Sequence, residues 1–203
     1  IEGVDYLHKA VHEVIPDRIE AGTYTIIASL LGNNLKINKL IPSHIESLTS
    51  KLIEAGVDME IGDDYIIVNK VNDYKAINVK TLVYPGFPTD LQPQMGVVLS
   101  VSDGTSVINE SIWESRFQYT AELNKMGAKI IAQGKQAVFQ GVSKLKAAPV
   151  YASDLRAGAA LIIAGIIAEG KTEIYNLNHI DRGYENIEEK FRNLGAKIER
   201  VVE

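Results

Sequence analysis

The 203-residue chain contains no cysteine. This absence excludes disulfide bonds, thiolate metal sites and cysteine nucleophiles, and it fits a reducing, cytoplasmic setting. A long hydrophobic run is missing too, because the longest one, at residues 157–168, is shorter than the roughly 18 residues that a membrane-spanning helix needs. No signal-peptide pattern is present. We therefore expect a cytoplasmic protein that has no membrane partner.

An excess of positive charge is also lacking. The 21 Lys and Arg side chains face 26 Asp and Glu side chains, which leaves a formal net charge of -5. This balance argues against a nucleic acid partner, although a few arginines can still focus positive potential on a small anionic substrate. Patterns for P-loops, dinucleotide folds and zinc proteases are absent. His8 and His12 have a helical spacing but lack the glutamate of zinc proteases, which indicates a surface pair and no metal site.

What the sequence does contain is one pattern in three copies. Apolar residues make up 46% of the chain, which is enough for a single sizeable core. Each copy starts with an aspartate before an apolar segment, passes through a β-rich piece, and continues into an amphipathic helix that ends on a glycine. Glycine is favoured there because it adopts the left-handed conformation readily. The three copies cover roughly residues 15–70, 88–142 and 152–203.

The two helices of each copy differ in character. Residues 155–168 are apolar on nearly every side, which predicts a helix buried all round, whereas residues 184–194 are apolar on one side only, which predicts a surface helix. Three such buried helices predict an α/β fold turned inside out. We expect a single domain over residues 1–203, an inside-out α/β barrel of three βαβαββ-like units around buried helices. Each copy is expected to end on a strand, at residues 57–61, 128–131 and 196–199.

Aspartates at the start of two copies are candidates for chemistry. Asp90 follows a Pro-Gly-Phe-Pro-Thr loop and precedes a buried helix. It is either an N-cap that satisfies free amides, or a carboxylate in a cleft that accepts a proton from a substrate hydroxyl. Asp154 and Arg156 have the same two interpretations, as a helix cap with an ion pair or as two groups that face a ligand. The residues by themselves leave both interpretations open.

Two arginines occupy related positions before the amphipathic helices of the second and third copies. They are Arg116 and Arg182. A planar guanidinium suits capture of a carboxylate or phosphate, and a helix N-terminus nearby adds positive potential. The alternative is that both are exposed surface arginines, the commonest situation for this residue, and that His179 is a solvated histidine.

Six motifs together resemble the UDP-N-acetylglucosamine enolpyruvyl transferase family, whose relatives include the enolpyruvyl transferase of the shikimate pathway. The likeness runs in order over essentially the whole chain, and the UDP-sugar branch fits better than the shikimate branch. The motifs lie at residues 15–22, 87–92, 112–117, 152–157, 179–185 and 194–200.

The resemblance implies a two-domain enzyme whose active site lies in the cleft between two inside-out α/β domains. It implies transfer of enolpyruvate from phosphoenolpyruvate to the 3-hydroxyl of UDP-N-acetylglucosamine, with release of phosphate and without a cofactor. This reaction is the first committed step of peptidoglycan synthesis. The implied partners are these two substrates and the other, N-terminal domain of the same polypeptide.

Site residues follow from the same resemblance. Asp90 is expected to contact the sugar 3-hydroxyl and to act as the base, and the backbone of Ile112 to hold the UDP-sugar. Arg116 and Arg182 are expected to converge on the anionic groups of phosphoenolpyruvate and the intermediate. The residues expected to line or support the site are Asp154, Arg156 and His179.

Two features of the family are missing from the chain. These are a mobile loop that carries a cysteine or aspartate acid, and a lysine-asparagine pair near the start. Addition of a hydroxyl to an enol double bond needs a base, a proton donor and cations, and this sequence offers only the base and some of the cations. We therefore interpret the chain as the C-terminal half of the enzyme, inactive alone. The alternative is a non-catalytic binding or scaffold domain. Such a domain would not need the five charged site residues, which are Asp90, Arg116, Asp154, Arg156 and Arg182.

Overall fold

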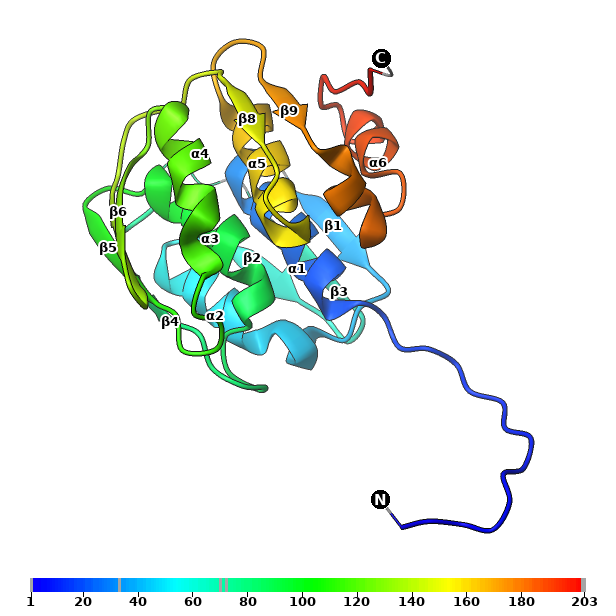
Figure 1. The fold of residues 1–203 in the computed structure, drawn as a ribbon. Coiled ribbons are helices and arrows are strands. Elements are labelled where there is room, and N and C mark those ends of the chain that lie inside the picture. The colour runs from blue at the N-terminus through cyan, green and yellow to red at the C-terminus, as the bar shows by residue number, and fades with distance from the viewer. Residues whose placement is uncertain (1, 33, 70, 72, 202–203) are drawn as a thin grey trace.

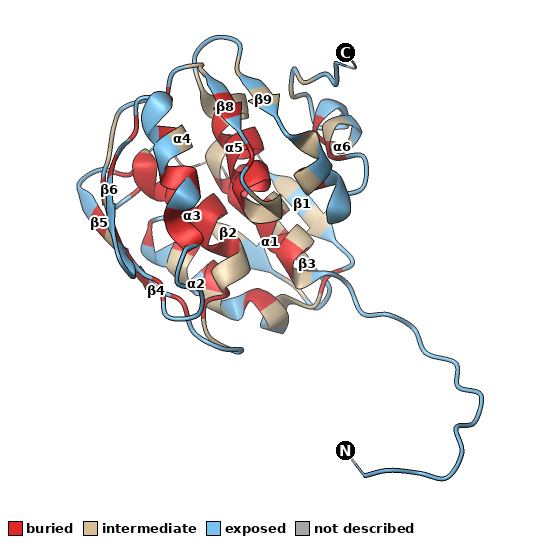
Figure 2. Ribbon diagram, in the orientation of Figure 1, coloured by how far each residue is buried: buried red, intermediate tan, exposed pale blue. Residues whose placement is uncertain are grey.

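Three helices form the centre of the protein in a computed structural model. They are α1 (Arg18–Leu31), α3 (Gln92–Ser100) and α5 (Leu155–Ile167), and each contacts the other two. Figure 2 shows that they carry much of the buried surface. This confirms the expectation of an α/β protein with its apolar helices inside. The structure describes residues 2–32, 34–69, 71 and 73–201, so the outermost residues of the first and third predicted copies, 70 and 202–203, lie outside it.

Helix α5 shows why these segments are buried. Residues 157–164 are all buried, as expected for a helix that has no polar side. Gly158 allows the Ile180 side chain to pack closely against α5, because a Cβ atom built at this glycine would lie only 2.4 Å from Cγ1 of Ile180. Within the described part of the chain, no helix combines the length and the hydropathy that crossing a bilayer requires.

Three amphipathic helices lie outside the central ones and bury one side each, as the pattern predicted. Short 3-10 helices lead into them and into α3. The outer helices are α2 (Glu46–Glu54), α4 (Tyr119–Lys125) and α6 (Ile187–Asn193). The 3-10 helices are η1 (Pro42–Ile45), η2 (Thr89–Leu91), η3 (Arg116–Gln118) and η4 (Leu177–Arg182).

The strands form three separate sheets around the helices (Figure 1). The first has the order β1-β3-β2 and is antiparallel, from β1 (Leu35–Asn38), β2 (Met59–Ile61) and β3 (Tyr65–Val68). The second has the order β4-β5-β7-β6, with β4 parallel to β5, from β4 (Asn78–Lys80), β5 (Thr105–Asn109), β6 (Lys129–Gln133) and β7 (Gln136–Gln140). The third is a parallel pair, β8 (Pro149–Tyr151) and β9 (Glu173–Tyr175).

The described strands do not close into one barrel, so the expectation of a barrel is not met. Only the second unit shows the complete βαβαββ order. Residues 2–17 contain no helix or strand.

The expectation of a strand at residues 196–199 is wrong. A strand needs a partner for its backbone groups. In the first two units the last strands, β3 and β7, form a hairpin with the strands before them. Residues 196–201 have no following strand in the described part of the chain to pair with.

Candidate active site

Two of the three leading aspartates cap a central helix. The Oδ1 atom of Asp17 accepts a hydrogen bond from the amide of Ile19 at 2.7 Å, at the start of α1. Asp154 Oδ1 accepts from the amides of Arg156 at 2.8 Å and Ala157 at 3.0 Å, at the start of α5. The capping interpretation is therefore correct for Asp154, but the expected ion pair with Arg156 is wrong among the described residues, because Arg156 pairs with Asp90 and Asp154 lies beside Arg116.

Asp90 behaves differently, because its carboxylate binds two arginines instead of helix amides. It lies in η2, where its Oδ1 accepts from Arg116 Nη2 and its Oδ2 from Arg156 Nη2, each at 3.0 Å. Helix α3 begins without a side-chain cap and has Pro93 in its first turn, and proline has no amide hydrogen to satisfy. The capping interpretation is wrong for Asp90.

Arg116 is buried, so its interpretation as a surface arginine is wrong. Its side chain is 2% exposed. Besides Asp90, it contacts the carbonyl oxygen of Thr89, to which Nε donates at 3.2 Å, and its Nη1 lies 3.9 Å from Asp154 Oδ1. The guanidinium carbon lies 4.9 Å from the centroid of the Trp113 ring. A buried cation needs such compensation, because its transfer out of water is costly.

Arg156 connects this site to a polar contact in the core. Its guanidinium carbon lies 5.9 Å from the centroid of the Tyr184 ring. The Tyr184 hydroxyl is hydrogen-bonded to Thr23 Oγ1 at 2.8 Å, and the Gln94 amide donates to Thr23 at 3.2 Å. Burial raises the pKa of Tyr184, while the hydrogen bond with Thr23 and the charge of Arg156 offset part of this effect. Since the Gln94 amide also lies 3.4 Å from the Tyr184 hydroxyl, the buried tyrosine joins α1 and α3.

These four residues, Asp90, Arg116, Asp154 and Arg156, form what we name the charged cluster. They come from η2, η3 and the start of α5, and the sequence predicted all four as site residues. Two positive and two negative side chains leave the cluster without formal net charge. Its carboxylates face outward, since the side chains of Asp90 and Asp154 are 37% and 36% exposed. The cluster therefore offers accessible carboxylates held by arginines below them.

Three other predicted site residues lie outside the cluster. Ile112 is exposed, and its amide donates to Glu110 Oε1 at 2.8 Å. Arg182 is exposed in η4 and has no side-chain partner among the described residues, and His179 is half-buried in the same element. The end of η4 adjoins the start of α5, because a Cβ atom at Gly183 would lie 2.6 Å from the Leu155 side chain. The convergence of Arg182 with Arg116 on one anion stays a prediction.

One residue was missed from the sequence. Glu110 is buried and accepts four hydrogen bonds, one of them from Thr89, the neighbour of Asp90. The sequence does give one indication of a role for Glu110. It is an acidic residue at the end of a predicted strand, two residues before Ile112, which is expected to hold the UDP-sugar. Its donors could not be predicted, because two of them lie more than twenty residues away in the sequence.

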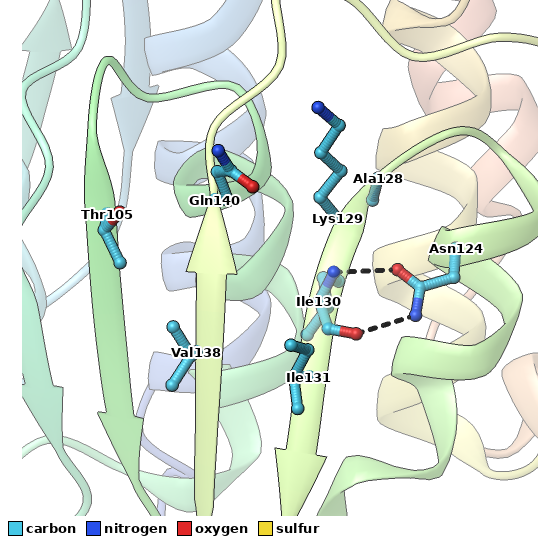
Figure 3. Close-up of a pocket in the computed structure, with 8 residues that line it drawn as sticks. All are labelled: Thr105, Asn124, Ala128, Lys129, Ile130, Ile131, Val138 and Gln140. Atoms are coloured by element: carbon cyan, nitrogen blue, oxygen red, sulfur yellow. Dashed lines mark hydrogen bonds between the residues drawn. The ribbon is translucent and has the colours of Figure 1, made fainter.

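Two hollows lie away from the charged cluster. One, of about 450 Å³, lies between β5, β7, β6 and the end of α4 (Figure 3). There the Asn124 amide exchanges two hydrogen bonds of 2.9 Å with the backbone of Ile130, which ties α4 to β6. The other, of about 470 Å³, lies between the C-terminal ends of α1 and α5. Across the described residues, no group of three or more His, Asp or Glu side chains is placed to hold a metal ion.

Comparison with known proteins identifies the class. The model of the EPSP synthase (3-phosphoshikimate 1-carboxyvinyltransferase) family matches residues 1–191, and the chain belongs to this family. Among its curated relatives is the UDP-N-acetylglucosamine 1-carboxyvinyltransferase of Clostridium botulinum, which is 53% identical over 99% of this chain and 48% of its own length. A protein of that name from Caldanaerobacter subterraneus, numbered 3, is 50% identical over 100% of this chain and 49% of its own length.

Solved structures agree with this assignment. The enolpyruvyl transferase NikO from Streptomyces tendae has a TM-score of 0.83 at 26% identity, over 91% of this chain and 44% of that protein. EPSP synthase from Acinetobacter baumannii has a TM-score of 0.71 at 15% identity, over 94% of this chain and 48% of that protein, and shares the fold. The chain thus spans about half the length of its relatives.

Proposed function

We propose that this chain is the C-terminal half of a UDP-N-acetylglucosamine 1-carboxyvinyltransferase. The complete enzyme transfers enolpyruvate from phosphoenolpyruvate to the sugar 3-hydroxyl and releases phosphate, in the cytoplasm, as the first committed step of peptidoglycan synthesis. One observation carries this proposal: in a chain that is 53% identical to such an enzyme, residues from three separate segments meet in the charged cluster.

Asp90 is the base in this proposal. Each of its oxygens accepts from one arginine, so the carboxylate is held in one orientation while part of it faces solvent. It takes the proton of the 3-hydroxyl as that oxygen forms a bond to the central carbon of phosphoenolpyruvate. The electron pair of the double bond accepts a proton at the methylene carbon from an acid in the other half. Phosphate then leaves, the new methyl group loses a proton, and the double bond forms again.

The arginines neutralise the negative charge of phosphoenolpyruvate and the intermediate. Arg182 is exposed and free of partners among the described residues, so it can bind an anion directly. Arg116 donates from Nη2 to Asp90 and from Nε to Thr89, and its Nη1 lies 3.9 Å from Asp154 Oδ1. Because its side chain is 2% exposed, Arg116 adds positive charge behind Asp90. Arg156 lines the site between Asp90 and Tyr184, Asp154 fixes the start of α5, and His179 supports the site from η4.

The proposal includes the domain organisation. Residues 1–203 form one inside-out α/β domain with three repeats around α1, α3 and α5. The rest of the protein contributes a second domain of the same kind, which carries the acid and the lysine-asparagine pair. Coverage of only 48% of the Clostridium botulinum relative supports this division.

A chimera tests the proposal. The chain is joined to the N-terminal half of the Clostridium botulinum relative, and phosphate release from phosphoenolpyruvate is measured with UDP-N-acetylglucosamine as the acceptor. We expect release by the chimera and none by the chain alone, where the acid is missing. Release with 3-phosphoshikimate instead would contradict the proposed acceptor. Binding of both substrates by a folded chimera without any release would favour the non-catalytic alternative.

A further inference from the structure

Among the described residues, no arginine or lysine forms an ion pair with the buried carboxylate of Glu110. This residue follows β5 directly and is 2% exposed. Its Oε1 accepts from the Thr81 hydroxyl at 2.7 Å and from the amides of Ile112 at 2.8 Å and Trp113 at 3.1 Å, while Oε2 accepts from the Thr89 hydroxyl at 3.0 Å. Burial of a carboxylate is costly unless it is hydrogen-bonded. Four donors from three segments, at Thr81, Thr89 and residues 112–113, provide that compensation.

Two of the three segments that Glu110 joins carry proposed site residues. Thr89 precedes Asp90 in η2, and its carbonyl oxygen accepts from Arg116. Ile112 and the residues after it form the connection from β5 to η3. The Glu110 carboxylate is therefore a direct link between the segment of the proposed base and the segment that is expected to hold the UDP-sugar.

Core packing does not hold the second segment in place. Residues 111–115 are all exposed. Ser111 is hydrogen-bonded to Thr81 through its amide at 2.8 Å and through its hydroxyl, and the next two amides are both held by Glu110. Among the described residues, Glu110 and Thr81 thus provide the hydrogen bonds that fix the backbone of residues 111–113.

The hydrogen bond to Glu110 also decides which backbone group of Ile112 is left for a ligand. The amide is occupied, whereas the carbonyl oxygen accepts no hydrogen bond from the described residues. A ligand held by the backbone of Ile112 must therefore donate to this carbonyl. Its direction depends on the two amides that Glu110 fixes on either side of it, those of Ile112 and Trp113.

We propose that Glu110 is a positioning residue that sets the distance between the Asp90 carboxylate and the Ile112 carbonyl, and so aligns the acceptor sugar with its base. The proposal rests on the proposed function. Its basis is geometric: the reach of the side chain brings Oε1 to the 112–113 amides and Oε2 to Thr89 at the same time. The length of the side chain matters more than its charge, because all four partners are neutral donors.

Two substitutions in the chimera distinguish the effect of the length of the Glu110 side chain from the effect of its charge. Glu110→Gln keeps the length and Oε1, and the Thr89 hydroxyl can rotate to accept from the new amide. We expect kcat/KM for UDP-N-acetylglucosamine to fall about fivefold or less, the effect of one ordinary hydrogen bond. Glu110→Asp keeps the charge but withdraws the carboxylate, and we expect a loss of about 100-fold, as for a reacting group misplaced by 1 Å.

The matched control is Glu114→Gln in the same segment, whose side chain is 86% exposed. It should leave both kinetic constants unchanged. A positioning role further requires that KM for the sugar nucleotide rises in Glu110→Asp while KM for phosphoenolpyruvate does not, at a melting temperature that shows a folded protein. Should Glu110→Asp fail to fold, Thr89→Val removes the Oε2 contact alone and should lower kcat without loss of fold.

The outcomes separate the two proposals. If the unmodified chimera releases no phosphate with UDP-N-acetylglucosamine, the proposed function is wrong. If it does so and Glu110→Asp is as active as Glu110→Gln, or if Thr89→Val has unchanged kinetics, the positioning role is wrong and Glu110 is a structural residue only.

Discussion

Removal of the Asp90 carboxylate should destabilise the chain through Arg116. Asp90→Ala leaves the buried guanidinium without its main partner. Loss of one partner of a buried ion pair costs about 3–5 kcal/mol. Two features reduce the cost here, because Asp90 is itself partly exposed to screening solvent and Asp154 remains 3.9 Å from Arg116 Nη1.

We therefore expect Asp90→Ala to lower the free energy of unfolding by about 2 kcal/mol, less than a fully buried pair. For a domain of this size the melting temperature would fall by about 4–8 °C. Urea unfolding followed by circular dichroism measures the first quantity. Fluorescence of Trp113, the single tryptophan, reports the change beside Arg116.

The matched control is Asp17→Ala, which removes the equivalent aspartate of the first copy. That residue caps α1 and forms no ion pair with any arginine of the described residues, so its loss should cost about 1 kcal/mol. A second substitution tests the cause directly. Since an apolar side chain needs no charge partner, Asp90→Ala with Arg116→Leu should be more stable than Asp90→Ala alone. A double variant less stable than the single one would refute the reasoning.

Three further predictions concern catalysis and pH. In the chimera, Asp90→Asn should lower kcat by about 10²–10⁴-fold and weaken UDP-sugar binding by only about 1 kcal/mol, as steady-state kinetics and calorimetry would measure. Arg182→Lys should raise KM for phosphoenolpyruvate because the planar fork is lost, with no change in melting temperature; unchanged kinetics would return Arg182 to the role of a surface residue. The Arg200 guanidinium holds the pKa of Asp181 and Glu188 below their usual values of 3.8 and 4.5. This stabilisation is present above those values and is lost as the pH falls through the lower, folded-state pKa, so the stability difference between Arg200→Ala and the unmodified chain should shrink in acid, as urea unfolding at several pH values would show.

The central helices could be predicted because their signal is local. A segment such as residues 155–168 is apolar on nearly every side, and only burial all round accommodates it. The strand expected at residues 196–199 depends instead on a partner strand. Its local pattern matches β6, yet the following strand that pairs with β6 has no counterpart in the described part of the chain.

The roles of the leading aspartates required the structure. Asp17, Asp90 and Asp154 are alike in the sequence, but η2 and Pro93 remove the amides that Asp90 would cap. The burial of Arg116 could not be predicted from the sequence either, because its carboxylate partners, Asp90 and Asp154, come from other segments of the chain. The sequence pointed to the four residues that meet in the charged cluster, whereas their pairing depends on long-range packing.

The unpaired edge of β1 has a practical consequence for the chain on its own. In the described part of the chain, β1 pairs with β3 and with no other strand. An open edge presents a row of free amide and carbonyl groups to which another molecule can add a strand. Concentrated solutions of the isolated chain are therefore prone to self-association through intermolecular sheets. Unfolding curves of its variants should accordingly be recorded at several protein concentrations, since a midpoint that shifts with concentration measures assembly together with folding.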